Sequence, residues 1–356
     1  MMIEQPFDQE KAEAFAGRMV EMLNHAALIL MTSVGHQVGL FDTLANQPPG
    51  SSQQIAKAAG LQERYVREWL GAMTTGQIVA CDPDKGTYWL PPEHARWLTR
   101  AVGVDNLALQ APYIPMLAQV EAPIIECFRN GGGVPYSAYP RLQELLRAET
   151  GAVHDAVLVD TVLPLVSGLV ERLQAGIEVA DVGCGSGHAL NLMAQAFPHS
   201  QFVGYDLSEA GLAMGRREAQ EMGLSNVHFE RCNASDLHVS RRFGLITAFD
   251  AIHDQVWPAR VLHNIRTALQ PDGVFLMVDF GASSHIHENM DFPLGPFLYT
   301  ISCMHCMTVS LSENGSGLGA MWGEQKARQM LAEAGFTQVE VKKVEGDLLN
   351  NYYIAR

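Results

Sequence analysis

Three glycines at alternate positions form the first group of residues that could do chemistry. Gly183, Gly185 and Gly187 lie in the segment VADVGCGSGHAL, directly after an apolar run. Glycine lets the backbone approach a ligand closely, and the free amides at the start of a following helix favour a polar or anionic ligand. The segment therefore indicates a loop that binds a nucleotide-type cofactor.

An acidic residue follows this loop at the distance expected for a ribose contact. Asp206 ends the next apolar run, 19 residues after Gly187, where its carboxylate could accept hydrogen bonds from ribose hydroxyls. The dinucleotide fingerprint G-x-G-x-x-G would place its third glycine where this chain has His188. The spacing departs from that of nicotinamide enzymes, but Asp206 fits either cofactor class, so an NAD-dependent oxidoreductase is one alternative function.

A histidine followed by an aspartate is the second group, in the segment FDAIHDQVWPARVLHNIRTALQPDG. A histidine whose pKa is near neutrality can take a proton from a hydroxyl or a protonated amine. His253 is therefore a candidate general base, with Asp254 beside it. The alternative interpretations are a histidine that caps the following helix and one that is hydrogen-bonded in an interface.

The segment SCMHCM contains soft side chains that could bind a metal ion. Cys303, His305 and Cys306 lie here, and His285 belongs to an H-x-H pair earlier in the chain. A single C-x-x-C without a second pair is a poor zinc signature, and the surrounding Met and Phe residues favour a pocket lining. We expect no metal centre.

The elements that must position these residues alternate between strand-like and helix-like segments from about residue 152. Alternation of this kind predicts an α/β fold with a doubly wound parallel sheet, and two adjacent strands at the C-terminus imply an antiparallel ending. The predicted strands are 177–183, 201–207, 227–232, 245–249, 274–280, 338–344 and 351–356. The predicted helices are 151–173, 188–197, 209–222, 259–269 and 324–334.

The first third of the chain has a different pattern. A helix is predicted from about residue 10 to 46, followed by helices over 51–60 and 61–76 and a β-hairpin around the turn DPDKG. Helix, turn, helix and hairpin is the order of a winged helix. We therefore divide the chain into an α-rich winged-helix domain (1–100), a helical connector (101–151) and a cofactor-binding domain (152–356).

Together these motifs resemble the class I S-adenosylmethionine-dependent methyltransferases. The resemblance rests on Asp181 and the glycines, on Asp206, on the Asn-Ala pair after the third strand and on the antiparallel C-terminal strands. It implies a Rossmann-like methyltransferase sheet and S-adenosylmethionine as the cofactor. The cofactor contacts that it implies are Asp181, Gly183, Cys184, Gly185, Gly187, Asp206, Leu207, Asn233, Ala234, Phe249 and Asp250.

Around His253 the chain is similar to small-molecule O-methyltransferases with an N-terminal winged helix, in which a His-Asp pair follows the fourth strand. It departs from them at Phe249, where plant enzymes often have lysine, and no downstream acid is assigned as the partner that orients His253. The resemblance implies a small-molecule acceptor, a lid formed by the connector and a homodimer through the N-terminal domain. Pocket residues implied by position, with ordinary aromatic packing as the alternative, are Tyr113, Tyr136, Tyr139, His154, His285 and His305.

The charge balance disfavours a nucleic-acid partner. The formal net charge is −15, and residues 1–110 contain 12 acidic and 8 basic side chains. The candidate recognition helix combines Arg64 and Arg67 with Glu63 and Glu68, which is a poor surface for phosphates. We expect dimerisation rather than DNA binding, and a transcriptional regulator that binds S-adenosylmethionine is the alternative function.

Two long segments, 22–41 and 292–312, lack charged side chains. Their length of roughly 20 residues fits a membrane span, but polar groups such as His25, His36 and His305 would be costly in lipid. We expect buried helices or pocket walls and no membrane contact. Six scattered cysteines and an N-terminus with acids in place of a secretory signal predict a reducing cytoplasm.

Overall fold

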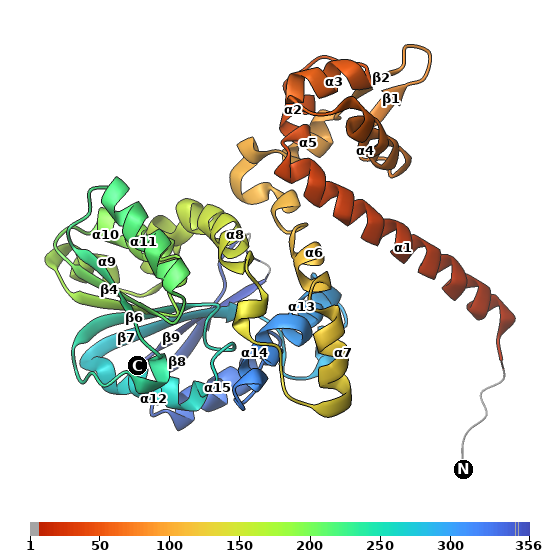
Figure 1. Cartoon of the computed structure of the whole chain (residues 1–356). Coiled ribbons are helices and arrows are strands. Elements are labelled where there is room, and N and C mark those ends of the chain that lie inside the picture. The colour runs from red at the N-terminus through yellow and green to blue at the C-terminus, as the bar shows by residue number, and fades with distance from the viewer. Residues whose placement is uncertain (1–6, 346, 348) are drawn as a thin grey trace. The chain divides into compact units, whose positions relative to one another are not determined.

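The chain divides into two compact units (Figure 1). The computed structural model describes residues 7–345, 347 and 349–356. The first unit ends at Pro115, and the second extends from Met116 to Arg356. Each unit has its own apolar core.

The first unit is helical with one short hairpin. Its elements are α1 (Gln9–Gln37), α2 (Leu40–Ala45), α3 (Ser52–Ala59), α4 (Glu63–Thr75), β1 (Ala80–Asp82), β2 (Thr87–Trp89) and α5 (Pro92–Leu98). Ser51 and Gln54 form a capping box that begins α3, and Gly60 ends this helix in the left-handed conformation. The antiparallel strands β1 and β2 follow α4. The winged-helix order predicted from the sequence is confirmed.

The N-terminal helix differs from its prediction in continuity and in burial. Gly39, with φ 74°, separates α1 from α2. Near its end, α1 packs closely at Gly35 on Trp69, whose Nε1–H donates to the Met31 carbonyl at 2.8 Å. The expectation that 22–41 is a buried helix is wrong over most of α1 in the single chain. Its exposed apolar side chains are Phe15, Met19, Val20, Met22, Leu23, Ile29, Leu30 and Val34.

The second unit contains a seven-stranded sheet in the order β5-β4-β3-β6-β7-β9-β8. The strands are β3 (Glu178–Val182), β4 (Gln201–Asp206), β5 (Val227–Arg231), β6 (Phe243–Phe249), β7 (Leu269–Phe280), β8 (Val339–Lys342) and β9 (Asn350–Ala355). Strands β3 to β7 pair in parallel, and β9 runs antiparallel to both of its neighbours. This confirms a Rossmann-like sheet with an antiparallel C-terminal strand.

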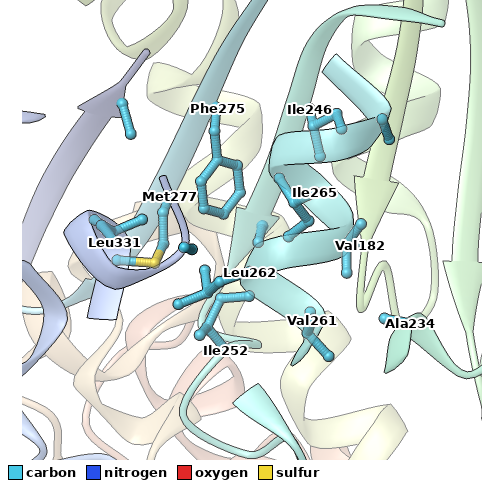
Figure 2. Packing of buried hydrophobic residues seen from close by; sticks show 14 of the residues in the cluster. Val182, Ala234, Ile246, Ile252, Val261, Leu262, Ile265, Phe275, Met277 and Leu331 are labelled. Atoms are coloured by element: carbon cyan, nitrogen blue, oxygen red, sulfur yellow. The ribbon is translucent and has the colours of Figure 1, made fainter. Parts of the chain in front are cut away.

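Helices cover both faces of this sheet. One apolar cluster includes residues of α12 (Pro258–Ala268) and α15 (Gly323–Glu333). The other includes residues of α9 (Leu169–Ala175), α10 (His188–Ala196) and α11 (Glu209–Glu221). Figure 2 shows Leu262 and Ile265 of α12 beside Phe275 and Met277 of β7. The buried faces fix the strands, and their carboxyl ends form one edge, where ligands bind in folds of this kind.

The helix predicted over 151–173 is interrupted. Helix α8 (Leu142–Val157) passes into a π turn (Leu158–Val162) and a short 3₁₀ turn (Leu163–Leu165), and α9 begins only after Gly168. Pro164 lacks the amide hydrogen that a continuous helix needs, and Gly168 has φ 74°.

The remaining helices are α6 (Tyr113–Ala118), α7 (Glu121–Asn130), α13 (Gly295–Ile301) and α14 (Met307–Ser312). A π turn, Ser302–Cys306, joins α13 to α14, so most of the second uncharged segment is helical. In the part of the chain that the structure describes, no single helix has the length and apolar character needed to cross a membrane. One bent pair, Leu142–Leu165 with Leu169–Ala175, meets the test by length and composition alone.

Candidate cofactor and active site

The glycine loop connects the end of β3 to the start of α10. Gly183, Gly185 and Gly187 have φ values of 74°, 55° and 69°, a region that other residues rarely adopt. A Cβ at Gly183 would lie 2.5 Å from the Cβ of Ala251, and one at Gly187 would lie 2.2 Å from Cε1 of Phe229. The loop therefore requires glycine for its conformation and for its close packing.

Asp206 holds this loop from the end of β4. Its Oδ2 accepts the amide hydrogen of Gly185 at 2.8 Å, and its Oδ1 accepts that of Ser208 at 2.7 Å. Burial raises the pKa of Asp206. A carboxylate offers about four lone-pair sites, so both oxygens retain capacity for hydroxyl donors such as those of a ribose.

Asp181 is buried in β3, two positions before Gly183. The hydroxyl of Thr247 donates to its Oδ1 at 2.8 Å. Burial raises the pKa of Asp181 to about 7, although the bond from Thr247 acts in the opposite direction. A cationic ligand nearby would favour the ionised form of this side chain.

The other predicted cofactor contacts follow β4, β5 and β6 or belong to the glycine loop itself. Asn233 caps a short 3₁₀ turn, with its Oδ1 accepting the amide hydrogen of Ser235 at 3.0 Å. Asp250, just after β6, has φ 49°, and its amide donates to the Val278 carbonyl at 2.9 Å. A non-glycine residue at positive φ stores strain of the kind found at functional sites. The remaining predicted contacts are Cys184, Leu207, Ala234 and Phe249.

His253 lies between β6 and α12, and its side chain is 2% exposed. Its Nδ1 is 2.8 Å and 3.0 Å from the two carboxylate oxygens of Asp279, and its Nε2 is 3.2 Å from Oδ1 of Asp254. Burial alone would lower the pKa of His253, but the carboxylates of Asp279 and Asp254 outweigh burial and raise it well above its usual value. The interpretation of His253 as a helix cap is wrong, because the N-cap of α12 is Trp257.

Asp279 is the functional candidate that the sequence analysis missed. It lies near the end of β7, fully buried, and its Oδ1 also accepts the amide hydrogen of Phe280 at 2.9 Å. The signal for it is a single acid in the otherwise apolar run VFLMVDF. Because β7 pairs in parallel with β6, this acid reaches the same edge of the sheet as the segment that carries His253.

Two tyrosines that precede α8 pack against the π turn Ser302–Cys306. The rings of Tyr136 and Tyr139 lie 5.9 Å and 4.8 Å from the ring of His305, and the Tyr139 hydroxyl donates to the Met304 carbonyl. Three of the predicted pocket residues are therefore brought together.

Tyr136 is also connected to the cofactor loop through Gln143. Its hydroxyl accepts a hydrogen bond from Gln143, whose Oε1 is 3.4 Å from a Cβ placed at Gly185. Burial raises the pKa of Tyr136, and the negative charges of Asp206 and Asp254 raise it further. The Tyr136 hydroxyl is therefore near both Asp206 of the cofactor site and Asp254 of the histidine segment.

The other three predicted pocket residues lie outside the cluster of Tyr136, Tyr139 and His305. His154 lies 4.9 Å from the ring of Phe249, and burial, with a smaller effect of His188, lowers its pKa to about 4. Tyr113 belongs to the first unit, where it is buried. His285 is exposed, with its ring 5.8 Å from that of His287, and its place in the pocket stays a prediction. In the same loop, Asn289 Oδ1 accepts the amide hydrogen of Ser283 and Asn289 Nδ2 donates to the Ser283 carbonyl, both at 2.8 Å.

Family models match both units. Residues 26–100 match the Rv2258c-like winged HTH domain, and residues 173–335 match a methyltransferase domain. Among curated relatives, the ubiquinone biosynthesis O-methyltransferase of Haemophilus ducreyi is 29% identical over 108 residues, which cover 29% of this chain and 44% of that protein. The corresponding protein of Leptothrix cholodnii is 31% identical over 28% of this chain and 43% of its own length. The chain thus spans less than half the length of these relatives.

Solved structures share the fold over the whole chain. Human N-acetylserotonin methyltransferase in complex with SAM has a TM-score of 0.67 at 17% identity, covering 100% of this chain and 99% of that one. Mitomycin 7-O-methyltransferase has a TM-score of 0.69 at 18% identity, covering 98% and 99%. The two family models identify a winged-helix domain followed by a methyltransferase domain in this chain, and the glycine loop and the strand order agree with that assignment.

Proposed function

We propose that this chain transfers a methyl group from S-adenosylmethionine to a hydroxyl group of a small molecule, with His253 as the general base. The buried pair of His253 and Asp279 carries the proposal. It lies beside the glycine loop, since Ala251, two residues before His253, contacts Gly183. A base next to the cofactor loop is the arrangement that proton removal from an acceptor requires.

The chemistry needs little more than alignment and a proton acceptor. When bound, S-adenosylmethionine supplies an electrophilic methyl group on a sulfonium. Asp279 holds the Nδ1–H of His253, which leaves Nε2 as the ring nitrogen that can accept a proton from the acceptor. Nε2 would take the proton of the acceptor hydroxyl, and its oxygen would receive the methyl group that bound S-adenosylmethionine supplies.

Asp254 occupies the position that the acceptor must reach. Its Oδ1 lies 3.2 Å from Nε2 and favours the protonated, inactive form of His253. An acceptor hydroxyl that replaces Asp254 at Nε2 removes part of this effect and lowers the pKa of His253. Binding of the acceptor would thus convert more of His253 to the neutral form that can act as a base.

The aromatic side chains favour a planar acceptor. Tyr136, Tyr139 and His305 form one cluster, and Phe280 lies 5.8 Å from the ring of His253. Aromatic walls bind flat molecules through offset or edge-to-face contacts. Phenols are the first acceptors to test, because a phenolic hydroxyl loses its proton far more readily than an alcohol.

The partner of α1 in this proposal is a second copy of the chain. The apolar side chains exposed along this helix form a surface that a soluble monomer would leave in water. Pairing of α1 with its counterpart would bury them, in line with the homodimer that the sequence analysis expects.

Methyl transfer from labelled S-adenosylmethionine to a panel of phenols and hydroxylated heterocycles tests the function. We expect labelled product from at least one acceptor and cofactor binding that the Asp206→Ala substitution weakens. Binding of NAD in preference to S-adenosylmethionine in a thermal-shift assay would contradict it.

A further inference from the structure

A buried thiol beside the proposed base has no part in methyl transfer. Cys306 lies in the π turn Ser302–Cys306 and is 4% exposed. Ligand atoms of His253, Asp254 and Cys306 all lie within 4.8 Å of one another. An imidazole nitrogen, a carboxylate oxygen and a sulfur at this separation can reach a single metal ion.

The metal-ligand candidates in the structure differ from those that the C-x-x-C pattern indicates. The C-x-x-C motif suggested Cys303 and Cys306 together, but only Cys306 belongs to the cluster with His253 and Asp254. In the wider π turn, the neighbouring residues His305 and Cys306 are both buried. Insertions of this kind occur often at functional sites.

The surroundings of the cluster have features typical of a metal site. Asp279 accepts the Nδ1–H of His253, which is the arrangement that commonly fixes a histidine whose other nitrogen binds zinc. His305 is 4% exposed, and its Nε2 has no hydrogen-bond partner among the residues that the structure describes. It directly precedes Cys306 in the same π turn.

We propose that His253 Nε2, the Asp254 carboxylate and Cys306 Sγ bind one Zn²⁺ ion, with His305 next to an open fourth position. Three protein ligands of mixed N, O and S type and one open position are typical of reactive zinc sites. The consequence for catalysis rests on the proposed function: the ion occupies the lone pair of Nε2, so the zinc-bound form cannot use His253 as a base.

Metal binding replaces protons in this site. Bonds form from zinc to Nε2 of His253 and to Sγ of Cys306, while the N–H and S–H bonds break and both protons pass to solvent. The oxidation state of every atom is unchanged.

Cobalt(II) tests binding without reference to activity. The metal-free full-length protein is titrated with Co²⁺, and the absorption of a cobalt–thiolate bond and of tetrahedral Co²⁺ is recorded. We expect one equivalent to bind and Zn²⁺ to displace it. Cys306→Ser should abolish the thiolate band and weaken binding at least tenfold, while the matched Cys303→Ser, three residues away, should retain both.

Measurements of methyl-transfer activity then test whether bound Zn²⁺ prevents His253 from acting as a base. We expect Zn²⁺ to inhibit methyl transfer by the unsubstituted protein and by Cys303→Ser, each relative to its own metal-free rate, and a chelator to restore it. Cys306→Ser should need at least tenfold more Zn²⁺ for the same inhibition. Absence of the thiolate band in the unsubstituted protein, or an equal band in Cys306→Ser, would overturn the zinc site, whether or not methyl transfer is observed. A band with no methyl transfer would leave the site standing and contradict the function instead.

Discussion

His253 has a different acid at each of its ring nitrogens. Asp279 is fully buried at the end of β7, whereas the side chain of Asp254 is 28% exposed and is therefore the one that an acceptor can replace. This difference separates their roles, because one acid orients the imidazole and the other competes with the acceptor. Both raise the pKa of His253, so the neutral base form grows as the pH rises through that raised value.

Replacement of Asp279 by asparagine tests the orienting role. The amide oxygen can still accept the Nδ1–H, but the negative charge is lost and the pKa of His253 falls. We expect kcat to drop on the order of a hundredfold with little change in cofactor KM, and the acidic limb of the pH profile of kcat/KM to move to lower pH. Both are measured with a chelator present. A drop in rate with an unmoved limb would reduce Asp279 to a structural role.

Asp181 predicts a pH dependence of cofactor binding. Its pKa is raised to about 7, and its ionised form attracts the positive charges of S-adenosylmethionine. Affinity should therefore increase as the pH rises through about 7, and decrease below it by up to about tenfold per pH unit. Calorimetric titrations on both sides of this pH measure the effect. In Asp181→Asn the dependence should vanish, and its persistence there would assign it to another group, such as Asp206.

The conformation of the glycine loop depends on close steric packing as well as on the backbone dihedral angles of its glycines. Gly187 and Gly223 have the same φ of 69°, but a Cβ meets Phe229 only at Gly187, with nothing within 4 Å at Gly223. The two positions therefore separate strain from steric conflict. Strain alone costs about 1–3 kcal/mol.

Gly187→Ala should accordingly destabilise the protein by about 1–3 kcal/mol more than Gly223→Ala. It should also weaken binding of S-adenosylmethionine, because the shifted loop changes its amides, whereas Gly223→Ala should leave the affinity unchanged. Urea unfolding and calorimetry provide the two readouts. Equal losses of stability in both variants would show that the Phe229 ring moves to make room for the new methyl group and that packing does not constrain the loop.

The sequence was sufficient for the strands and the glycine loop, because buried parallel strands are continuous apolar runs bounded by turns. It was insufficient at Gly39, because an isolated glycine is tolerated inside a helical pattern and the sequence alone does not show that its φ of 74° separates α1 from α2. Asp279 was missed for a similar reason. It lies 26 residues after His253, and only the pairing of β6 with β7 brings the two together.

At the scale of the whole molecule, the acidic balance and the exposed face of α1 point to self-association in preference to nucleic acid. The ion pairs of Glu63 with Arg67 and of Glu68 with Arg64 engage the basic groups of the would-be recognition helix. A DNA retardation assay at moderate salt should therefore show no specific complex. Specific retardation would favour a regulatory function for this domain.

Leu23→Glu tests the dimer through α1. Leu23 is 68% exposed in the single chain, and a charge there would be buried without a partner if two α1 helices pack together. We expect a dimer for the unsubstituted protein and a monomer for Leu23→Glu by sedimentation equilibrium. Tyr65→Glu is the matched control, since Tyr65 is 80% exposed on α4. A monomeric unsubstituted protein, or monomers in both variants, would contradict this interface.

The rate of methyl transfer by His253→Ala tests most directly whether His253 removes the acceptor proton. Single-turnover transfer from labelled S-adenosylmethionine is compared with that of the unsubstituted protein and of His263→Ala, which alters an exposed histidine on α12. We expect His253→Ala to lose roughly 10²–10⁴-fold in rate with unchanged cofactor affinity, and His263→Ala to retain full rate. Undiminished transfer by His253→Ala would contradict the account.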